Sequence, residues 1–233
     1  MSARRSTLAV LSLLVTLVPI ARAQDESSSP RSRWTVGGGG GAFMPQGEFA
    51  DRSGTNAVWE LFVTARPRAW GPWGVRLSAQ FMEHAHSDTT YALPGIDVET
   101  RTSSDLVLWT LGPELLIGRG PLRALGHAGI GVAWARTLTA IRTTTNDVGN
   151  GNDDDLTMGY EIGAALSWRL LRSELLSLEL GGRWNGTGPL EYVPESGIRR
   201  FAGELVLTPH RSRMDGVVLR AALGVSLDRM SWR

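Results

Sequence analysis

The feature that most constrains the fold is an alternation of apolar with small, polar or charged side chains along most of the chain after the first 32 residues. In the segment 57–67, for example, Trp59 and Leu61 alternate with Glu60 and Phe62. A period of two is the pattern of a β-strand with two unlike faces, because successive side chains point to opposite sides of a sheet. The sequence therefore predicts an all-β protein.

We expect eight strands whose connections alternate in length. The predicted strands are 33–45, 57–67, 74–86, 104–117, 123–140, 156–169, 174–187 and 216–229. The short connections are 68–73, 118–122 and 170–173, and the long ones are 46–56, 87–103, 142–155 and 188–215, the last with a possible hairpin at 198–208. Strands of a dozen residues are long for a soluble protein but suit a tilted membrane crossing. Short turns on one side and long loops on the other are typical of a transmembrane up-and-down antiparallel β-barrel, not of a sandwich with crossovers.

The first residues have the features of a secretory signal peptide. Arg4 and Arg5 precede the apolar run Leu8–Val18, and Ala21-Arg22-Ala23 is a small-residue cleavage site. We expect residues 1–23 to be removed near Ala23, residues 24–32 to form a flexible tail, and residues 33–233 to form the barrel. No later apolar stretch is long enough for a transmembrane helix, so an exported chain of this kind enters a membrane only as a closed barrel.

Composition excludes several other classes of protein. The chain has no Cys, which rules out a disulfide scaffold, a cysteine-ligated metal and a thiol nucleophile. All 24 basic residues are Arg, and loss of the three in the leader lowers the formal net charge from +1 to about −2. A chain without a basic domain is not expected to bind nucleic acid.

The small residues on the charged face indicate which side of the barrel meets lipid. A soluble barrel would turn its apolar face inward, whereas a membrane barrel turns it outward. The glycines on the charged face are Gly37, Gly39, Gly41, Gly129, Gly131, Gly163, Gly181 and Gly224. They would make room for long side chains in a narrow eight-stranded lumen, but would only weaken strands facing water. Because each Arg turned to lipid at the midplane costs about 2–4 kcal/mol, the charged set is expected inside.

The tryptophans give an independent prediction of the membrane boundaries. Trp is enriched at both membrane interfaces, where it forms girdles. The residues expected in these girdles are Trp34, Trp59, Trp70, Trp73, Trp134, Trp168, Trp184 and Trp232. Trp109 alone falls toward the middle of a strand.

Over essentially all of its mature length the chain resembles the small eight-stranded outer-membrane barrels of the OmpA transmembrane-domain type. The resemblance is carried by the leader and by Val36–Ala42, Gly47–Phe49, Gly181–Gly186 and Leu223–Leu227. It implies a monomer in the outer membrane of a Gram-negative cell, with outer-membrane lipids and the barrel-assembly machinery as partners. One departure is the C-terminus, where Trp232 is penultimate, whereas such barrels usually end on an aromatic residue.

The resemblance also implies a plugged interior packed by an ion-pair network. The inward candidates are Glu60, Arg76, Glu114, Glu161, Glu179, Arg183 and Arg220, with Arg66 near the rim. Buried charges persist only when they are paired and hydrogen-bonded. A structural filling and a gated proton or ion path are both compatible with this set.

Two other clusters are weaker candidates for a site. In the run 146–155, Asp147, Asp153 and Asp155 offer oxygen ligands for Ca²⁺, although the Glu of an EF-hand is missing, and a solvated loop tip is the other interpretation. His84 and His86 stand near Ser87, as the His and Ser of outer-membrane lipid-modifying hydrolases do, but no carboxylate is evident to orient a His.

We therefore expect a non-enzymatic barrel, without catalytic residues or cofactor, that has a structural or surface-binding role through its four long loops. Three alternatives remain at this point: a narrow pore or a channel for small hydrophobic molecules, an outer-membrane lipid-modifying enzyme, and a secreted soluble barrel that binds a ligand inside.

Overall fold

The computed structural model describes residues 34–51, 53–93, 96–143, 147–170, 175–192, 198–201 and 204–227. Within these ranges the description of Arg68 and of residues 84–102, 139–153 and 198–207 is limited to the backbone. The expected signal peptide, the N-terminal tail and Trp232 lie outside the described residues. In the described part of the chain, no helix is both long and apolar enough to cross a membrane.

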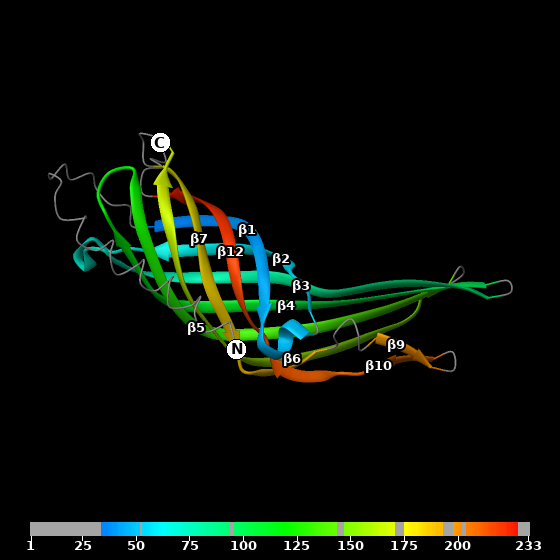
Figure 1. The fold of residues 1–233 in the computed structure, drawn as a ribbon. Helices are drawn as coiled ribbons and strands as arrows, with labels where there is room; N and C mark the ends of the chain where they lie inside the picture. The colour runs from blue at the N-terminus through cyan, green and yellow to red at the C-terminus, as the bar shows by residue number, and fades with distance from the viewer. Residues whose placement is uncertain are drawn as a thin grey trace.

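Eight antiparallel strands close into a barrel (Figure 1). They are β1 (Trp34–Gln46), β2 (Asn56–Ala65), β3 (Trp73–Leu93), β4 (Ile96–Ile117), β5 (Leu122–Thr143), β6 (Asp147–Arg169), β7 (Leu176–Thr187) and β12 (Asp215–Ser226). From β1 to β7 each strand pairs with its neighbour in sequence, and β12 closes the ring by pairing with both β7 and β1. The predicted all-β, eight-stranded, up-and-down barrel is confirmed.

The three short connections meet at one end of the barrel, which we call the turn end. The β2–β3 turn contains the short helix η3 (Arg68–Trp70), and the β4–β5 turn contains Gly118 and Gly120 with φ of 114° and 87°. These left-handed values favour glycine because it has no Cβ. Backbone bonds from Leu116 N to Pro72 O (3.0 Å) and from Arg169 N to Pro121 O (2.8 Å) connect neighbouring strands and turns.

At the opposite end, the hairpin end, two expected loops are strands instead. Residues 87–93 and 96–103 continue the β3–β4 ladder, and most of 142–155 continues the β5–β6 ladder, so that β3 to β6 run far beyond the other four strands (Figure 1). The prediction of loops there was wrong. Two strands that leave the barrel together still satisfy each other's backbone groups, and their polar sequences give no apolar period to read.

The last connection folds back on itself. Residues 198–208 contain the expected hairpin, formed by β9 (Ile198–Phe201) and β10 (Glu204–Leu207). A second ladder joins β8 (Pro189–Tyr192) to β11 (His210–Arg213) and was not predicted. The short helix η2 (Gly47–Asp51) follows β1 and contacts both β11 and β12.

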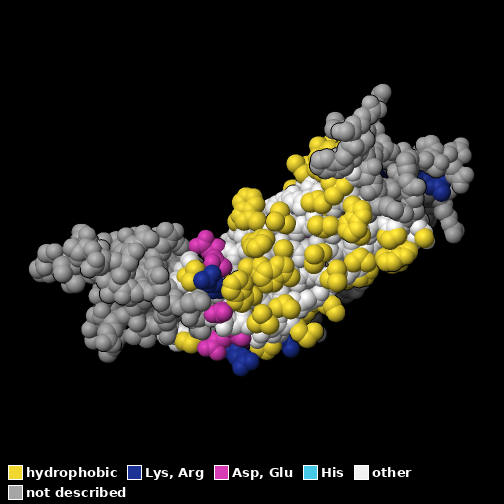
Figure 2. All heavy atoms as spheres, turned by 180° about the vertical axis from the view of Figure 1, so that it is seen from behind, with side chains coloured by type: hydrophobic (Ala, Val, Ile, Leu, Met, Phe, Trp, Pro, Cys, Tyr) yellow, Lys and Arg dark blue, Asp and Glu magenta, His cyan; other side chains and the backbone are white. Residues whose placement is uncertain are grey.

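Exposed large apolar side chains lie on all eight barrel strands and form an apolar belt, one face of which is seen in Figure 2. Leu180 is 50% exposed while its neighbour Glu179 is only 4% exposed, the reverse of what a soluble barrel would show. On β5 the outward positions stay apolar or small from Leu122 to Trp134. At a rise of about 3.3 Å per residue and a tilt of about 40°, that length covers about 30 Å, the thickness of a bilayer's hydrocarbon core. The soluble alternative is therefore wrong, and the barrel is built to span a membrane.

A row of charged residues limits the belt at the hairpin end. Glu83 pairs in register with Asp105, Asp105 with Arg136, and Arg136 with Asp154. Partial burial raises the pKa of Asp105 above its ordinary value, Glu83 raises it further, and Arg136 opposes the change. The row therefore belongs in the headgroup region or beyond, where charge can remain hydrated.

Two glycines of β5 provide a test of the packing. A Cβ at Gly131 would lie 1.8 Å from the carbonyl oxygen of Trp109, whereas a Cβ at Gly126 meets nothing within 4 Å. We expect Gly131→Ala to lower the free energy of unfolding by about 1–3 kcal/mol because the backbone must shift. Gly126→Ala, the matched control, should leave it unchanged or slightly higher. Urea titration of the refolded barrel measures both, and equal stabilities would contradict the described register.

Candidate functional site: a charged cluster and an apolar layer inside the barrel

The charged residues expected to face inward lie together in the lumen. They are Glu60 on β2, Arg76 on β3, Glu114 on β4, Glu161 on β6, Glu179 and Arg183 on β7, and Arg220 on β12, and each is at most 5% exposed. Together with Arg66 we call them the charged cluster. Because six strands contribute to it, the cluster connects nearly the whole circumference of the wall.

Glu60 is at the centre of the charged cluster. Its carboxylate lies 2.8 Å from Nη1 of Arg183, 2.8 Å from Nη1 of Arg220 and 3.1 Å from Nη2 of Arg76. Arg220 and Arg76 also reach Glu179, at 2.8 and 3.3 Å. One carboxylate therefore compensates three guanidinium groups from three different strands.

Glu114 holds the side of the cluster nearest the turn end. It accepts hydrogen bonds from Thr64 (3.2 Å), Arg76 (3.0 Å) and Arg66. Arg66, which we expected near the rim, is only 9% exposed and belongs to this buried ion pair. With it, the four Glu of the cluster face four Arg, so the cluster is formally neutral.

Glu161 is bound chiefly by neutral donors. Ser78, Thr110 and Gln80 donate to it at 2.9, 2.6 and 2.6 Å, and Asn185 donates to Gln80 at 2.5 Å. These polar residues were not among the site residues predicted from the sequence. Their inward position in the alternating pattern was the signal that would have found them.

His127 is a further buried residue that the sequence analysis missed. It is 6% exposed on β5, and its Nε2 lies 4.0 Å from Glu161. A Cβ at Gly163 would come within 2.6 Å of this ring, so the glycine on β6 makes room for the imidazole. Through His127, strand β5 also supplies a polar side chain to the interior beside Glu161.

The glycine run of β1 makes room for the cluster in the same way. A Cβ at Gly37 would lie 2.3 Å from the ring of Phe62, and that ring lies 3.7 Å from the guanidinium of Arg76 in a cation–π contact. Gly39 and Gly41 would collide with the backbone of β12. These glycines therefore allow strands β1 and β12 to approach closely around a filled interior.

Toward the hairpin end the lumen is apolar, which the alternating pattern did not predict. We call the following buried residues the apolar layer: Phe43, Phe49, Val58, Met82, Leu106, Leu108, Ala133, Ala135, Leu190, Tyr192, Met214 and Val218. We expected small, polar or charged residues on the inner face along the full length of the strands. The inner positions become apolar where they lie beneath side chains from the long connections, which exclude water from this part of the barrel.

The connections close the apolar layer from above. Phe49 of η2 is 0% exposed, and its ring centroid lies 6.0 Å from that of Phe43 and 5.4 Å from that of Tyr192. A cavity lined by residues of the apolar layer and by Gln80, Asn185 and Thr187 has a volume of about 10 Å³, enough for roughly one water molecule. His210 and Glu48 (3.2 Å) connect β11 to η2 at the surface.

The structure adds little support for the aspartate cluster in 146–155 or for the histidine cluster at 84–87 as functional sites. Asp147 begins β6 directly after the connection 144–146, Asp153 lies within the strand, and the side chains of both are outside the described part. The carboxylate of Asp155 accepts hydrogen bonds from the backbone of Leu156 and Glu191, each at 2.8 Å. Among the described residues no three potential ligands are grouped to hold a metal ion. The side chains of His84, His86 and Ser87 also lie outside the described part.

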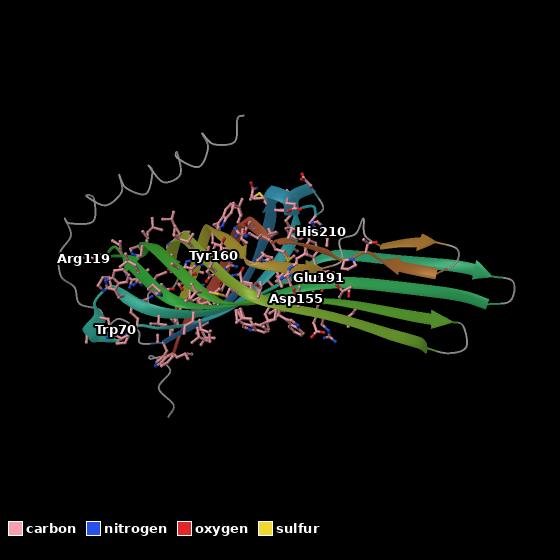
Figure 3. The ribbon with its side chains drawn as sticks, turned by 90° about the horizontal axis from the view of Figure 1, so that it is seen from below. Trp70, Arg119, Asp155, Tyr160, Glu191 and His210 are labelled. Carbon is pink, nitrogen blue, oxygen red and sulfur yellow. The ribbon has the colours of Figure 1, made fainter. Side chains whose placement is uncertain are left out.

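Most of the tryptophans expected in the girdles face outward. Their exposed fractions are 49% for Trp34, 67% for Trp59, 51% for Trp70, 49% for Trp73, 53% for Trp168 and 36% for Trp184. Trp134 stacks on Trp109, with ring centroids 6.3 Å apart. Figure 3 shows Trp70 at the turn end and Tyr160 on the barrel wall.

Comparison with known proteins identifies similar architectures only. No family model matches the chain, and no curated protein matches it. Among solved structures, Neisserial surface protein A is 10% identical with a TM-score of 0.46, over 84% of this chain and 98% of that one. Ail of Yersinia pestis is 10% identical with a TM-score of 0.42, over 84% and 98% of the two chains. A major outer membrane protein of Thermus thermophilus is 12% identical with a TM-score of 0.45, over 83% and 98%. At these values the likeness supports no conclusion about function.

The central position of Glu60 leads to a prediction. Glu60→Gln removes the charge that compensates three arginines, so we expect the free energy of unfolding to fall by about 3–5 kcal/mol. Adding Arg183→Gln to the same chain should recover part of the loss, because the cluster is neutral again. Urea or thermal unfolding in detergent measures both changes.

Glu48→Gln is the matched control for Glu60→Gln. Glu48 is paired with His210 at the surface, where such pairs contribute at most about 1 kcal/mol. A Glu60→Gln variant no less stable than Glu48→Gln would show that charge balance does not stabilise the lumen.

Proposed function

We propose that the protein is an outer-membrane barrel with a closed lumen and a structural or surface-binding, non-enzymatic role. The observation that carries the proposal is that two different layers of side chains fill the lumen at successive levels along the barrel axis. The charged cluster occupies one part and the apolar layer occupies the part toward the hairpin end.

The two layers oppose the passage of an ion in different ways. A hydrated ion would have to separate buried ion pairs, and removal of one partner from such a pair costs about 3–5 kcal/mol. It would then have to cross the apolar layer, and the cavity of about 10 Å³ between this layer and Gln80 cannot hold an ion with its water shell. The two layers in series support a barrel that does not conduct.

The extended hairpins support the surface role. Strands β3 to β6 continue past the charged row formed by Glu83, Asp105, Arg136 and Asp154, and therefore project into water. Binding residues are commonly carried on segments that a rigid scaffold presents at a surface. In outer-membrane barrels the longer connections face the outside of the cell.

The apolar layer favours a second candidate function, the passage of small hydrophobic molecules. Phe49 fills the space such a molecule would need, so η2 would have to move away first. Entry of a hydrophobic dye into cells tests this: if Phe49→Ala, but not Ala50→Gly, speeds entry, the layer is a gated route.

Planar-bilayer recording tests the closed lumen. We expect background conductance from the parent protein, and also from Arg183→Ala and Phe49→Ala, because each variant opens only one of the two layers. Both variants should unfold at a lower temperature than the parent. Large discrete conductance steps in the parent would contradict a closed barrel.

Trimming the hairpins tests the surface role. A chain in which a short turn joins Glu83 to Asp105 keeps the charged cluster and the belt, so we expect it to show the heat-modifiable gel migration of a folded barrel. Cells carrying this chain should be retained less on glass coated with extracellular-matrix extract than cells carrying the full chain. Equal retention would argue for a purely structural role.

A further inference from the structure

Charge is distributed unevenly between the two ends of the barrel. The described residues of the turn segments, 66–73, 117–124, 169–170 and 175, contain five arginines and no carboxylate. The described residues of the hairpin-end segments 46–56, 83–105, 136–155 and 188–215 contain fourteen carboxylates and seven arginines. The turn end is therefore basic, whereas the hairpin end is acidic.

Arg119 is the most prominent cation of the turn end. It is exposed between Gly118 and Gly120, both in the left-handed backbone region, so the tight turn presents its side chain at the tip. Figure 3 shows Arg119 and Trp70 at the turn end, while Asp155, Glu191 and His210 lie toward the hairpin end.

The other turn-end arginines whose side chains the structure describes differ in how deeply they are buried. Arg66 is buried and paired with Glu114 of the charged cluster. Arg123 and Arg169 are partly exposed, and Arg169 donates to the carbonyl of Gly120, which fixes the base of the turn that carries Arg119. Among the turn-end arginines whose side chains the structure describes, Arg119 is therefore the exposed one.

Exposed aromatic side chains place the turn end at the depth of lipid headgroups. Trp34, Trp73 and Trp168 are 49%, 49% and 53% exposed at the strand ends nearest the turns. Trp prefers the interface between hydrocarbon and water. A guanidinium just beyond such a girdle meets lipid phosphates, which it can bind through two parallel hydrogen bonds.

We propose that the turn end binds the phosphate groups of anionic phospholipids and so selects these lipids in the leaflet on that side. The inference rests on the membrane-spanning barrel of the proposed function. Positive charge near a membrane attracts anionic headgroups, whereas the acidic hairpin end repels them. The preference is accordingly confined to one end of the molecule.

Electron paramagnetic resonance of spin-labelled lipids tests the proposal. The parent barrel is placed in phosphatidylcholine vesicles with labelled phosphatidylglycerol or labelled phosphatidylcholine, and the motionally restricted fraction gives the relative association of each lipid. We expect phosphatidylglycerol to be preferred by roughly fivefold for each arginine engaged, with the preference lost at high salt.

Variants assign the preference to the turn end. Arg68→Gln combined with Arg119→Gln should abolish most of it, and the matching Lys substitutions should retain it. Arg211→Gln combined with Arg213→Gln changes the same number of charges at the hairpin end, where both residues are exposed, and should leave the preference intact.

Two outcomes would overturn the proposal: an absence of preference in the parent, or an equal loss in the hairpin-end variant. If the lipid preference is absent but the parent sediments with peptidoglycan in a manner that needs Arg119, the surface binds an acidic polymer and the lipid assignment is wrong. Heat-modifiable migration is recorded for every variant. Its presence shows that the barrel is folded, so a failed lipid preference leaves the proposed function standing, whereas its absence from the parent overturns both.

Discussion

The structure depends on the requirement that no backbone polar group be left unpaired in hydrocarbon. Pairing of β1 with β12 removes the two sheet edges, one on each of these strands, that the belt would otherwise expose. That closure needs β1 to approach β12 closely, which Gly39 and Gly41 permit because a Cβ at either would collide with backbone atoms of β12. A narrow closed cylinder then has an inside and an outside. Because lipid rejects charge, Glu60 and its three arginines have only the inside available.

The two layers of the lumen follow from how water is excluded at each level. Around Glu60 the four strands that supply charge compensate one another, so burial is tolerated without solvent. Near the hairpin end the cover comes from the connections, and Phe49 and Leu190 are both fully buried. Apolar side chains beneath such a cover need no hydrogen-bond partners, whereas charged side chains there would need compensating charges and hydrogen bonds. The described side chains consequently fill the lumen in two unrelated ways.

Alternation in the sequence was sufficient to predict strand number, closure and facing, because a shift of one residue would have turned Arg76 and Arg220 to lipid. It placed Glu179 inside and Leu180 outside, as the structure has them. It could not predict that Glu60 contacts Arg183 and Arg220, since those contacts depend on rotamers and shear across strands far apart in sequence. It also missed the apolar layer and the strand extensions, because Phe49 and Leu190 come from connections without a period, and the sequences of the extensions show no sustained apolar period.

The unequal strand lengths fix the outer boundary of the membrane independently of side-chain chemistry. Pairing of β2 with β3 ends at Val58 and Met82, and beyond this point one edge of β3 is open. On β6, pairing with β7 ends at Gly159, and the carbonyl of Met158 is still satisfied by the amide of Gly188. Open edges are stable only where water can bond to them. The hydrocarbon must therefore end near these residues, which is also where the charged row from Glu83 to Asp154 begins. Backbone and side-chain requirements thus place the membrane boundary at the same level, and the extended hairpins lie wholly in water.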